Sequence, residues 1–273
     1  LEDALKQNSD VKIVSFVHAE TSTGALSDAK TISEIAHKHD CLVIADTVTS
    51  LAGSELRVDD WQLDAVYSGT QKCLSCTPGL SPVTFSAAAA DAIKNRKTPV
   101  QSWFLDLNLV MGYWGTGAKR AYHHTAPINP LYALHEALVM VQDEGLENAW
   151  QRHEQNHHVL RAGLEAMGLS FFVNATDRLP QLNAVNIPSG IDEAAVRSRL
   201  LKQYNLEIGA GLGALAGKVW RIGLMGHASN INNISLCLAA LEATLIDMGF
   251  NCKAGAAAQA VNGKMREQNR IPE

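Results

Sequence analysis

The chain has 273 residues, of which 47% are hydrophobic and 19% charged, and its formal net charge is −5. This length allows a large core and predicts two domains. The charge balance provides no basic field for nucleic acid or for an anionic membrane surface. The sequence also holds no apolar run of the roughly 18 residues that a spanning helix requires.

Five cysteines are an odd and sparse count. That count is typical of a reducing compartment rather than of a disulfide scaffold, so a cytoplasmic location is expected. The closing residues, "RIPE", carry no clear peroxisomal signal.

The first half of the sequence alternates short apolar runs with an amphipathic helix. We expect a helix over residues 28–39, with Ser27 as its N-cap, because Ile32, Ile35 and Ala36 recur at helical spacing. Strands are expected over residues 11–18, 41–46, 64–69 and 81–86. This order indicates an α/β domain with a mostly parallel sheet. Because its strands are apolar throughout, both faces of the sheet are expected to be covered.

Two long helices follow. Asn129 as N-cap and Pro130 at the first helical position predict a helix over residues 129–145 that ends at Gly145. A second helix, over residues 146–167, is expected to end at Gly168. The apolar face of the first helix is expected to consist of Leu131, Leu134, Leu138 and Val141.

The composition changes beyond the second helix and indicates a smaller α+β domain. Its expected elements are strands over residues 169–173, 182–188 and 218–224 and helices near 192–204 and 230–247. We therefore divide the chain into the C-terminal portion of a large domain (1–145), a linking helix (146–165), a small C-terminal domain (166–248) and a loosely attached tail (249–273).

Polar residues follow the apolar strands where ligand sites of open α/β sheets lie, beyond the carboxyl ends of the strands. Asp46 follows one strand and Lys72 follows the next. A single Asp there is usually a cap, and a single Lys is usually a solvated group. Together they match one chemistry, in which a lysine amine forms a Schiff base with pyridoxal phosphate and a carboxylate keeps the ring nitrogen protonated.

Several stretches resemble one family. "FVHAETSTGAL", "LVIADTVTSLAG", "DAVYSGTQKCLSCTPGLSPVTFS", "YHHTAPINPLYALHEAL", "EGLENAW" and "GKVWRIGLMG" are similar, in matching order from about residue 10 to 248, to the class V aminotransferases. Within them they are most similar to the alanine–glyoxylate and serine–pyruvate branch. The resemblance implies the fold type I architecture of pyridoxal-phosphate enzymes, with a large and a small domain.

The resemblance also implies roles for residues near the strand ends. Lys72 is the Schiff-base lysine and the base that moves the substrate proton, and Asp46 is the partner of the pyridinium nitrogen. Val48 packs under the ring, Thr21 bonds the ring hydroxyl, and Gln71 helps to hold the phosphate.

Three further residues match the family. Tyr122 and Thr125 correspond to residues that reach the phosphate of the partner subunit's cofactor, so a homodimer is implied. Arg221 corresponds to the arginine that grips the substrate carboxylate, a bidentate task that suits a guanidinium. In the family, a preceding segment supplies a glycine-rich phosphate turn and a stacking aromatic residue. Residues 1–10, which read as the end of a helix, hold no counterpart.

Other motifs compete with this interpretation. Cys73 and Cys76 form a C-x-x-C pair, but Pro78 opposes a helix after them and no second pair offers zinc ligands, so we interpret them as bystanders. Residues 153–157 read H-E-x-x-H, the zinc-peptidase pattern. The polar residues around them indicate a solvated helix face, where His153 and His157 are expected to bind zinc or nickel only adventitiously.

A histidine pair and a glycine-rich stretch also resemble ligand-binding motifs. His123 and His124 are adjacent in an extended segment and are expected to point apart. The glycines of residues 209–217 lack the spacing of a phosphate loop and indicate a turn near the substrate.

The sequence therefore predicts a homodimeric aminotransferase that moves an amino group from alanine or serine to glyoxylate or pyruvate. A kynurenine-type amino acid or ureidoglycine is the alternative substrate within the class. A truncated dimerising scaffold without cofactor and a zinc hydrolase are alternatives from other classes.

Overall fold

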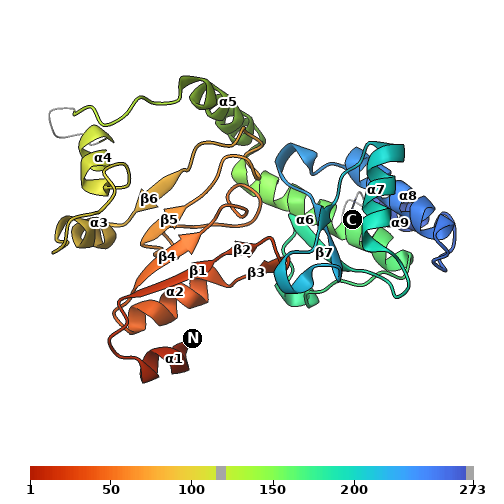
Figure 1. Cartoon of the computed structure of the whole chain (residues 1–273), viewed down its shortest axis with the longest axis horizontal. Coiled ribbons are helices and arrows are strands. Elements are labelled where there is room, and N and C mark those ends of the chain that lie inside the picture. Colours follow the sequence, from red (N-terminus) through yellow and green to blue (C-terminus); the bar gives the residue numbers. More distant parts are fainter. Residues whose placement is uncertain (115–120, 269–273) are drawn as a thin grey trace, which may run out of the picture.

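The computed structural model describes residues 1–114 and 121–268 and divides into two regions joined by a long helix (Figure 1). The first region holds α1 (Glu2–Gln7), β1 (Ile13–Val17), β2 (Ala19–Glu20), β3 (Ala25–Leu26), α2 (Ala29–Lys38), β4 (Leu42–Asp46), β5 (Ala65–Tyr67), β6 (Val83–Phe85), α3 (Ala87–Lys94), α4 (Leu107–Trp114) and α5 (Ile128–Glu144). The joining helix and second region hold α6 (Leu146–Ala166), η1 (Ala175–Asp177), β7 (Leu182–Asn186), α7 (Glu193–Tyr204), β8 (Gly209–Ala210), η2 (Gly213–Leu215), β9 (Val219–Gly223), η3 (Gly226–Ala228), α8 (Ile231–Asp247) and α9 (Ala256–Gln268).

The first sheet has the strand order β1-β4-β5-β6, with β1, β4 and β5 parallel and β6 antiparallel. The expected mostly parallel sheet is thus confirmed. Its buried face packs on α2 through a cluster that includes Val14, Val43, Ala45 and Val66. The parallel strands bring their carboxyl ends to one edge of the sheet, which is where the candidate site forms.

The opposite face of this sheet is open. Ile13 and Val17 on β1 and Tyr67 on β5 are exposed, while Leu42 and Ile44 on β4 are only half-buried. The expectation that both faces are covered is therefore wrong for the described residues of this chain. That expectation rested on uninterrupted apolar runs. Such runs do not show whether the residues that cover each sheet face belong to the same chain.

Helix α2 begins at Ala29, one residue later than expected, and its N-cap shifts by one residue as well. Asp28 is the N-cap, and its Oδ1 accepts a hydrogen bond from the Thr31 amide at 3.0 Å. The Ser27 hydroxyl instead donates to the Val17 carbonyl at 2.9 Å. Ser27 thus anchors the loop to the end of β1, and the expectation that Ser27 caps the helix is wrong.

Helix α5 begins at Ile128 with Pro127 at the N-cap, rather than at Pro130 with Asn129 as cap. Pro130 is tolerated inside the first turn because the first amides of a helix have no intrahelical acceptor. The inward face is also shifted from the predicted one. Ala137 is buried and Leu134 and Val141 pack on a small core cluster, whereas Leu131 and Leu138 are exposed. As predicted, the helix ends at Gly145, whose φ of 83° suits glycine.

The second region has an antiparallel sheet of order β7-β9-β8, covered by α6, α7, α8 and α9 (Figure 1). Trp220 on β9 is fully buried in its core. The strand expected over residues 169–173 is reduced to one bridge, between Phe171 and Val185. None of the helices within residues 1–114 and 121–268 is long and apolar enough to cross a membrane.

The tail predicted to be loose over residues 249–273 is instead structured where it is described. Helix α9 packs along α6 and α8, and Ala257 and Val261 are buried in the core of the second region. The Glu242 carboxylate of α8 accepts hydrogen bonds from the Gly255 and Ala257 amides, at 2.8 and 2.9 Å, and so caps the helix. Residues 269–273 lie outside the described residues.

Candidate active site

Asp46 ends β4, in register with Val17 on β1 and Tyr67 on β5. Its Oδ1 accepts a hydrogen bond from the Val48 amide at 2.9 Å, and its Oδ2 accepts one from the Tyr67 hydroxyl at 2.8 Å. The hydrogen bond to Asp46, aided by partial burial, raises the pKa of the Tyr67 phenol. Asp46 is thus a half-buried carboxylate held in one orientation, with lone pairs left to accept a further donor.

The sequence pattern does not point to Tyr67 as a site residue, because an aromatic side chain in a short apolar run usually indicates packing. The available signal was its position: it ends the strand beside the one that Asp46 ends.

The loop after β5 lies against the loop after β4. The Ser68 hydroxyl donates to the Thr47 carbonyl at 2.9 Å. A Cβ at Gly69 would lie 2.9 Å from Gln71 Oε1 and 3.3 Å from Val48 Cγ1. The absence of a side chain at Gly69 therefore leaves room beside the side chains of Val48 and Gln71.

Lys72 lies in a closed turn within this second loop. The Ser75 amide donates to the Lys72 carbonyl and the Cys76 amide donates to the Thr70 carbonyl, both at 3.0 Å. The Lys72 side chain is half-buried, and its ammonium makes no hydrogen bond or ion pair with the residues that the structure describes. The primary amine is therefore available for chemistry.

Arg221, on β9 of the second region, reaches the first region. Its Nη1 donates to the Thr21 carbonyl at 3.1 Å, and its Nε donates to the Ala210 carbonyl at 2.7 Å. Thr21 lies in the turn between β2 and β3, and Gly24 in the same turn accepts a backbone hydrogen bond from Leu179 at 2.8 Å. The fold thus unites two predicted site residues that are 200 positions apart in the sequence.

Tyr122 and Thr125 lie next to each other, with 2.6 Å between the two hydroxyl oxygens. Both are exposed, Tyr122 at 73%. Among the described residues they make no hydrogen bond to Asp46, Gln71 or Lys72. They therefore form an exposed pair separate from these three residues.

The neighbouring histidines do not point apart as predicted. The Nδ1 atoms of His123 and His124 are 2.8 Å apart, and His123 stacks on Trp103 with 4.1 Å between ring centroids. The prediction assumed a regular extended segment, and stacking on Trp103 turns the His123 ring instead.

The cysteine pair plays no part in the site. Cys73 and Cys76 are free thiols. Cys73 is buried, its thiol donates to the Thr49 carbonyl at 3.3 Å, and burial raises its pKa to about 12. A thiol that stays protonated is a poor nucleophile and a poor metal ligand, which agrees with the interpretation of the pair as bystanders.

The two histidines of the H-E-x-x-H motif are buried, not solvated as predicted. His153 bonds the Ala149 carbonyl and the Gly226 amide, and His157 bonds Asn183 Oδ1 at 2.7 Å. Within residues 1–114 and 121–268, no cluster of three or more histidine, cysteine or acidic residues could hold a metal ion. The zinc interpretation, including adventitious binding by this pair, therefore loses its basis.

Comparisons with known proteins agree with this geometry. The family model described as aminotransferase class V matches residues 1–236. The (S)-ureidoglycine–glyoxylate transaminase of Bacillus subtilis is 39% identical over 95% of this chain and 67% of its own length. The alanine–glyoxylate aminotransferase of Callithrix jacchus is 38% identical over 90% of this chain and 59% of its own length.

A solved structure is also similar to this chain. The crystal structure of ureidoglycine–glyoxylate aminotransferase from Bacillus subtilis superimposes with a TM-score of 0.92 at 40% identity, over 97% of this chain and 68% of that one. The chain thus spans between 59% and 68% of the length of these relatives.

Proposed function

We propose, from the premise that the chain belongs to the class V aminotransferase family, that the protein is a pyridoxal-phosphate-dependent aminotransferase. It moves an amino group from a small amino acid, alanine or serine, to glyoxylate or pyruvate. Three features support the proposal: the Asp46 carboxylate is held in one orientation, the Lys72 amine has no hydrogen bond or ion pair among the described residues, and the Arg221 guanidinium of the second region reaches the Thr21 carbonyl of the first.

The residues present fit pyridoxal phosphate. Gly69 leaves a gap between Val48 and Gln71 that a Cβ would fill. Asp46 supplies an acceptor for a ring nitrogen, while Thr21 and Gln71 supply polar groups for the ring substituents and the phosphate. When bound, the cofactor supplies an aldehyde and an electron-withdrawing ring.

The chain's own residues then have distinct tasks. With the cofactor bound, Lys72 Nζ would take the proton from the substrate Cα and return it, as a general base and acid. Asp46 would keep the ring nitrogen protonated, and Tyr67 and Val48 hold its two carboxylate oxygens in place. Arg221 keeps an Nη2 edge without a hydrogen-bond partner among the described residues, and this edge suits a substrate carboxylate.

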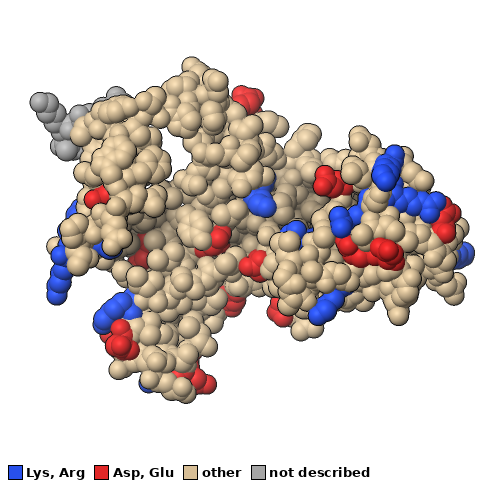
Figure 2. Space-filling model, in the orientation of Figure 1, with Lys and Arg blue, Asp and Glu red and all other residues tan. Residues whose placement is uncertain are grey.

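A homodimer is part of the proposal. The segment around α4 and the start of α5 exposes large apolar side chains and shows few charges in this view (Figure 2). Trp103, Phe104, Tyr122 and Tyr132 are each more than half exposed. A second copy on this surface would cover these side chains and receive the Tyr122–Thr125 pair. The proposed location is cytoplasmic, from the cysteine count alone.

Ureidoglycine is the alternative amino donor that a specific observation favours. The relative from Bacillus subtilis is named for ureidoglycine and glyoxylate, and the relative from Callithrix jacchus for alanine and glyoxylate. Glyoxylate is common to both names, so it is the first acceptor to test.

The deciding experiment is amino transfer from L-alanine to glyoxylate by the full-length protein, compared with its Lys72→Ala variant. Lys94→Ala, at an exposed lysine of α3, is the matched control. We expect Lys72→Ala to abolish transfer and to prevent reductive trapping of pyridoxal phosphate on the peptide that contains Lys72, while Lys94→Ala retains both. Transfer at the wild-type rate by Lys72→Ala would overturn the assignment. Dimers that bind no cofactor would favour the scaffold alternative.

A further inference from the structure

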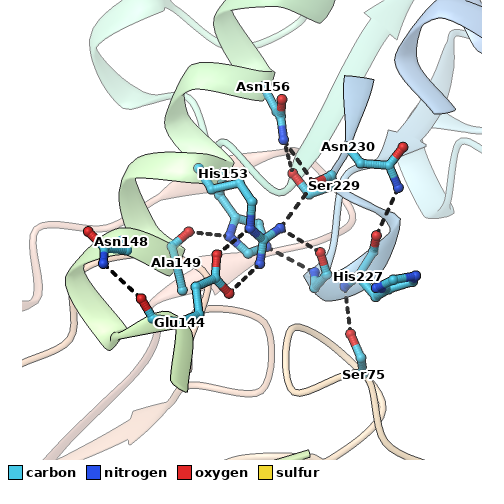
Figure 3. Close-up of polar contacts among 11 residues, drawn as sticks. Ser75, Glu144, Asn148, Ala149, His153, Asn156, His227, Ser229 and Asn230 are labelled. Carbon is cyan, nitrogen blue, oxygen red and sulfur yellow. Dashed lines mark hydrogen bonds and ion pairs between the residues drawn. The ribbon is translucent and has the colours of Figure 1, made fainter. Parts of the chain in front are cut away.

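His153, the first histidine of the H-E-x-x-H motif, belongs to a polar cluster that extends to Ser75, in the loop that carries Lys72 (Figure 3). The cluster joins three parts of the chain: α6, the η3 turn of the second region, and the loop that carries Lys72. We call Arg152, His153, Gly226 and Ser75 the Gly226 clamp. Of the four, the sequence singles out only His153, and only for adventitious metal binding.

His153 uses both ring nitrogens in the clamp. The Gly226 amide donates to Nε2 at 2.9 Å, so Nε2 is the acceptor. The proton therefore lies on Nδ1, which donates to the Ala149 carbonyl at 2.6 Å. The ring is buried, and burial lowers its pKa, which maintains the neutral form that can accept from Gly226.

Arg152 holds the other backbone group of the same glycine. Its Nη1 donates to the Gly226 carbonyl at 2.8 Å and to the Ser229 carbonyl at 3.0 Å. Its remaining edge forms an ion pair with Glu144, with 2.9 Å between Nη2 and Oε2. Consecutive residues of α6 thus fix both the amide and the carbonyl of Gly226.

The opposite side of Gly226 contacts the Lys72 loop. A Cβ at this glycine would overlap Ser75 Oγ and would lie 2.7 Å from the Cys73 carbonyl oxygen. The next residue, His227, donates its amide to Ser75 Oγ at 2.7 Å. Both Gly226 and Ser75 have φ of 57°, and the Ser75 amide closes the turn onto the Lys72 carbonyl at 3.0 Å.

The clamp therefore lies on a short path between two site residues. Ser75 is three residues beyond Lys72, and Gly226 is five residues beyond Arg221 on β9. Amino transfer requires the lysine amine and the carboxylate-binding guanidinium to be held at a fixed separation, because small misplacements cost rate. The clamp connects the segments that carry these two groups.

We propose that His153 is a positioning residue: by holding Gly226 against Ser75, it fixes the Lys72 turn relative to the strand that carries Arg221. The roles of Lys72 and Arg221 in this statement rest on the proposed function. The contacts that connect their two segments do not rest on the proposed function, and they can be tested without measuring turnover.

The first test is amide hydrogen exchange in the full-length protein. His153→Leu should raise exchange of the amides in residues 70–76 and 225–229 by about tenfold or more, because local opening there becomes easier. His157→Leu is the matched control: it removes a buried histidine one helical turn away that bonds Asn183 and not the η3 turn. His153→Gln, whose Oε1 can accept from the Gly226 amide, should restore protection. Equal exchange in the two leucine variants would overturn the proposal.

A second variant covers the case in which His153→Leu does not fold. Ser75 is exposed, so Ser75→Ala should leave the fold intact while removing the acceptor of the His227 amide. Exchange of that amide should rise by about tenfold. Unchanged protection of His227 would overturn the link between the η3 turn and the Lys72 loop.

Kinetics with L-alanine and glyoxylate then test positioning itself. His153→Leu should lower kcat by about tenfold while KM changes by less than about twofold. KM is retained because Arg221 keeps its bonds to Thr21 and Ala210. An equal fall of kcat in His157→Leu, or a change in KM alone, would overturn the positioning role. If the wild-type protein transfers no amino group, the proposed function fails, and the exchange data still decide the clamp.

Discussion

The sheets of the two regions differ in how they are covered. The sheet of β1, β4, β5 and β6 has one face on α2 and leaves Ile13, Val17 and Tyr67 exposed on the other. The sheet of β7, β9 and β8 is covered on both faces, and four of the five residues of β7 are buried. One face packs in the helical core, and the other packs on Leu215 and on Ala19 of the first region. The candidate site groups Asp46 and Lys72 belong to the open region, while Arg221 is presented by the enclosed sheet. A sheet covered on both faces thus carries one group, and a sheet with an exposed face carries the other two.

The largest expected effect tests the enclosed region. Leu238 on α8 is buried against Gly163, where a Cβ would overlap its side chain. Leu238→Ala should destabilise the protein by about 4 kcal/mol, because the close-packed site cannot collapse around the cavity. Urea unfolding followed by circular dichroism measures the change.

The matched substitution on the open sheet is Ile13→Ala. Ile13 is 51% exposed, so the change should cost less than about 0.5 kcal/mol in the chain as described. A cost above about 1 kcal/mol in the full-length protein would mean that something covers the open face, and the contrast between the two sheets would not hold for the whole protein.

The next effect is a pH dependence of the enclosed region. Burial lowers the pKa of His157 to about 4, from 6.5 for an exposed histidine. Between these values the unfolded chain binds a proton that the folded chain rejects. Stability is therefore full above pH 6.5 and falls by about 3 kcal/mol as pH drops to 4.

His157→Gln should remove this part of the slope when urea midpoints are measured from pH 7.5 to 4. His153, whose pKa burial also lowers, should retain its own contribution in the same direction. An unchanged slope in His157→Gln would show that other groups dominate the acid response.

On the open side, Asp46→Asn should lower turnover of L-alanine and glyoxylate by about a hundredfold or more, equivalent to about 2.7 kcal/mol. The side-chain amide of the asparagine cannot keep the ring nitrogen of the cofactor protonated. Asp10→Asn, at an exposed residue before β1, is the control. Equal rates in both variants would exclude Asp46 from the mechanism.

The smallest expected effect on turnover concerns Tyr67. Tyr67→Phe removes one hydrogen bond to Asp46 and should lower kcat by about fivefold, close to 1 kcal/mol. The Asp46→Asn, Tyr67→Phe double variant should be no slower than Asp46→Asn alone, because the tyrosine acts through the carboxylate. Additive losses would give Tyr67 a role independent of Asp46.

The position of Asp46 could be predicted from the sequence because strand ends follow a simple rule. Apolar runs that end in Asp46 or precede Lys72 predict both at one edge of a parallel sheet, and the register of β4 with β5 confirms that Asp46 ends its strand. The hydrogen bond of Tyr67 to Asp46 could not be predicted, because it depends on the register between strands, which the sequence does not show. The Tyr122–Thr125 pair could be matched to the family, and its role on a partner subunit stays a prediction.

Two of the failed predictions of the fold concern helices. The polarity around His153 and His157 resembled a solvated face, but neighbouring residues on a helix point in different directions and this face is buried. The prediction of a loose tail over residues 249–273 rested on its richness in alanine, glycine and asparagine. Alanine is the best helix former, and a distant carboxylate at Glu242 supplies the cap.

That cap has a practical consequence for protein engineering. Shortening the chain after residue 248 would remove α9 and leave the largely buried Glu242 carboxylate without the two amides that solvate it. It would also remove Ala257 and Val261 from the core that α9 shares with α6, the helix whose His153 accepts a hydrogen bond from the Gly226 amide. Expression variants and fusion junctions should therefore be designed beyond Gln268, and not at the apparent end of α8.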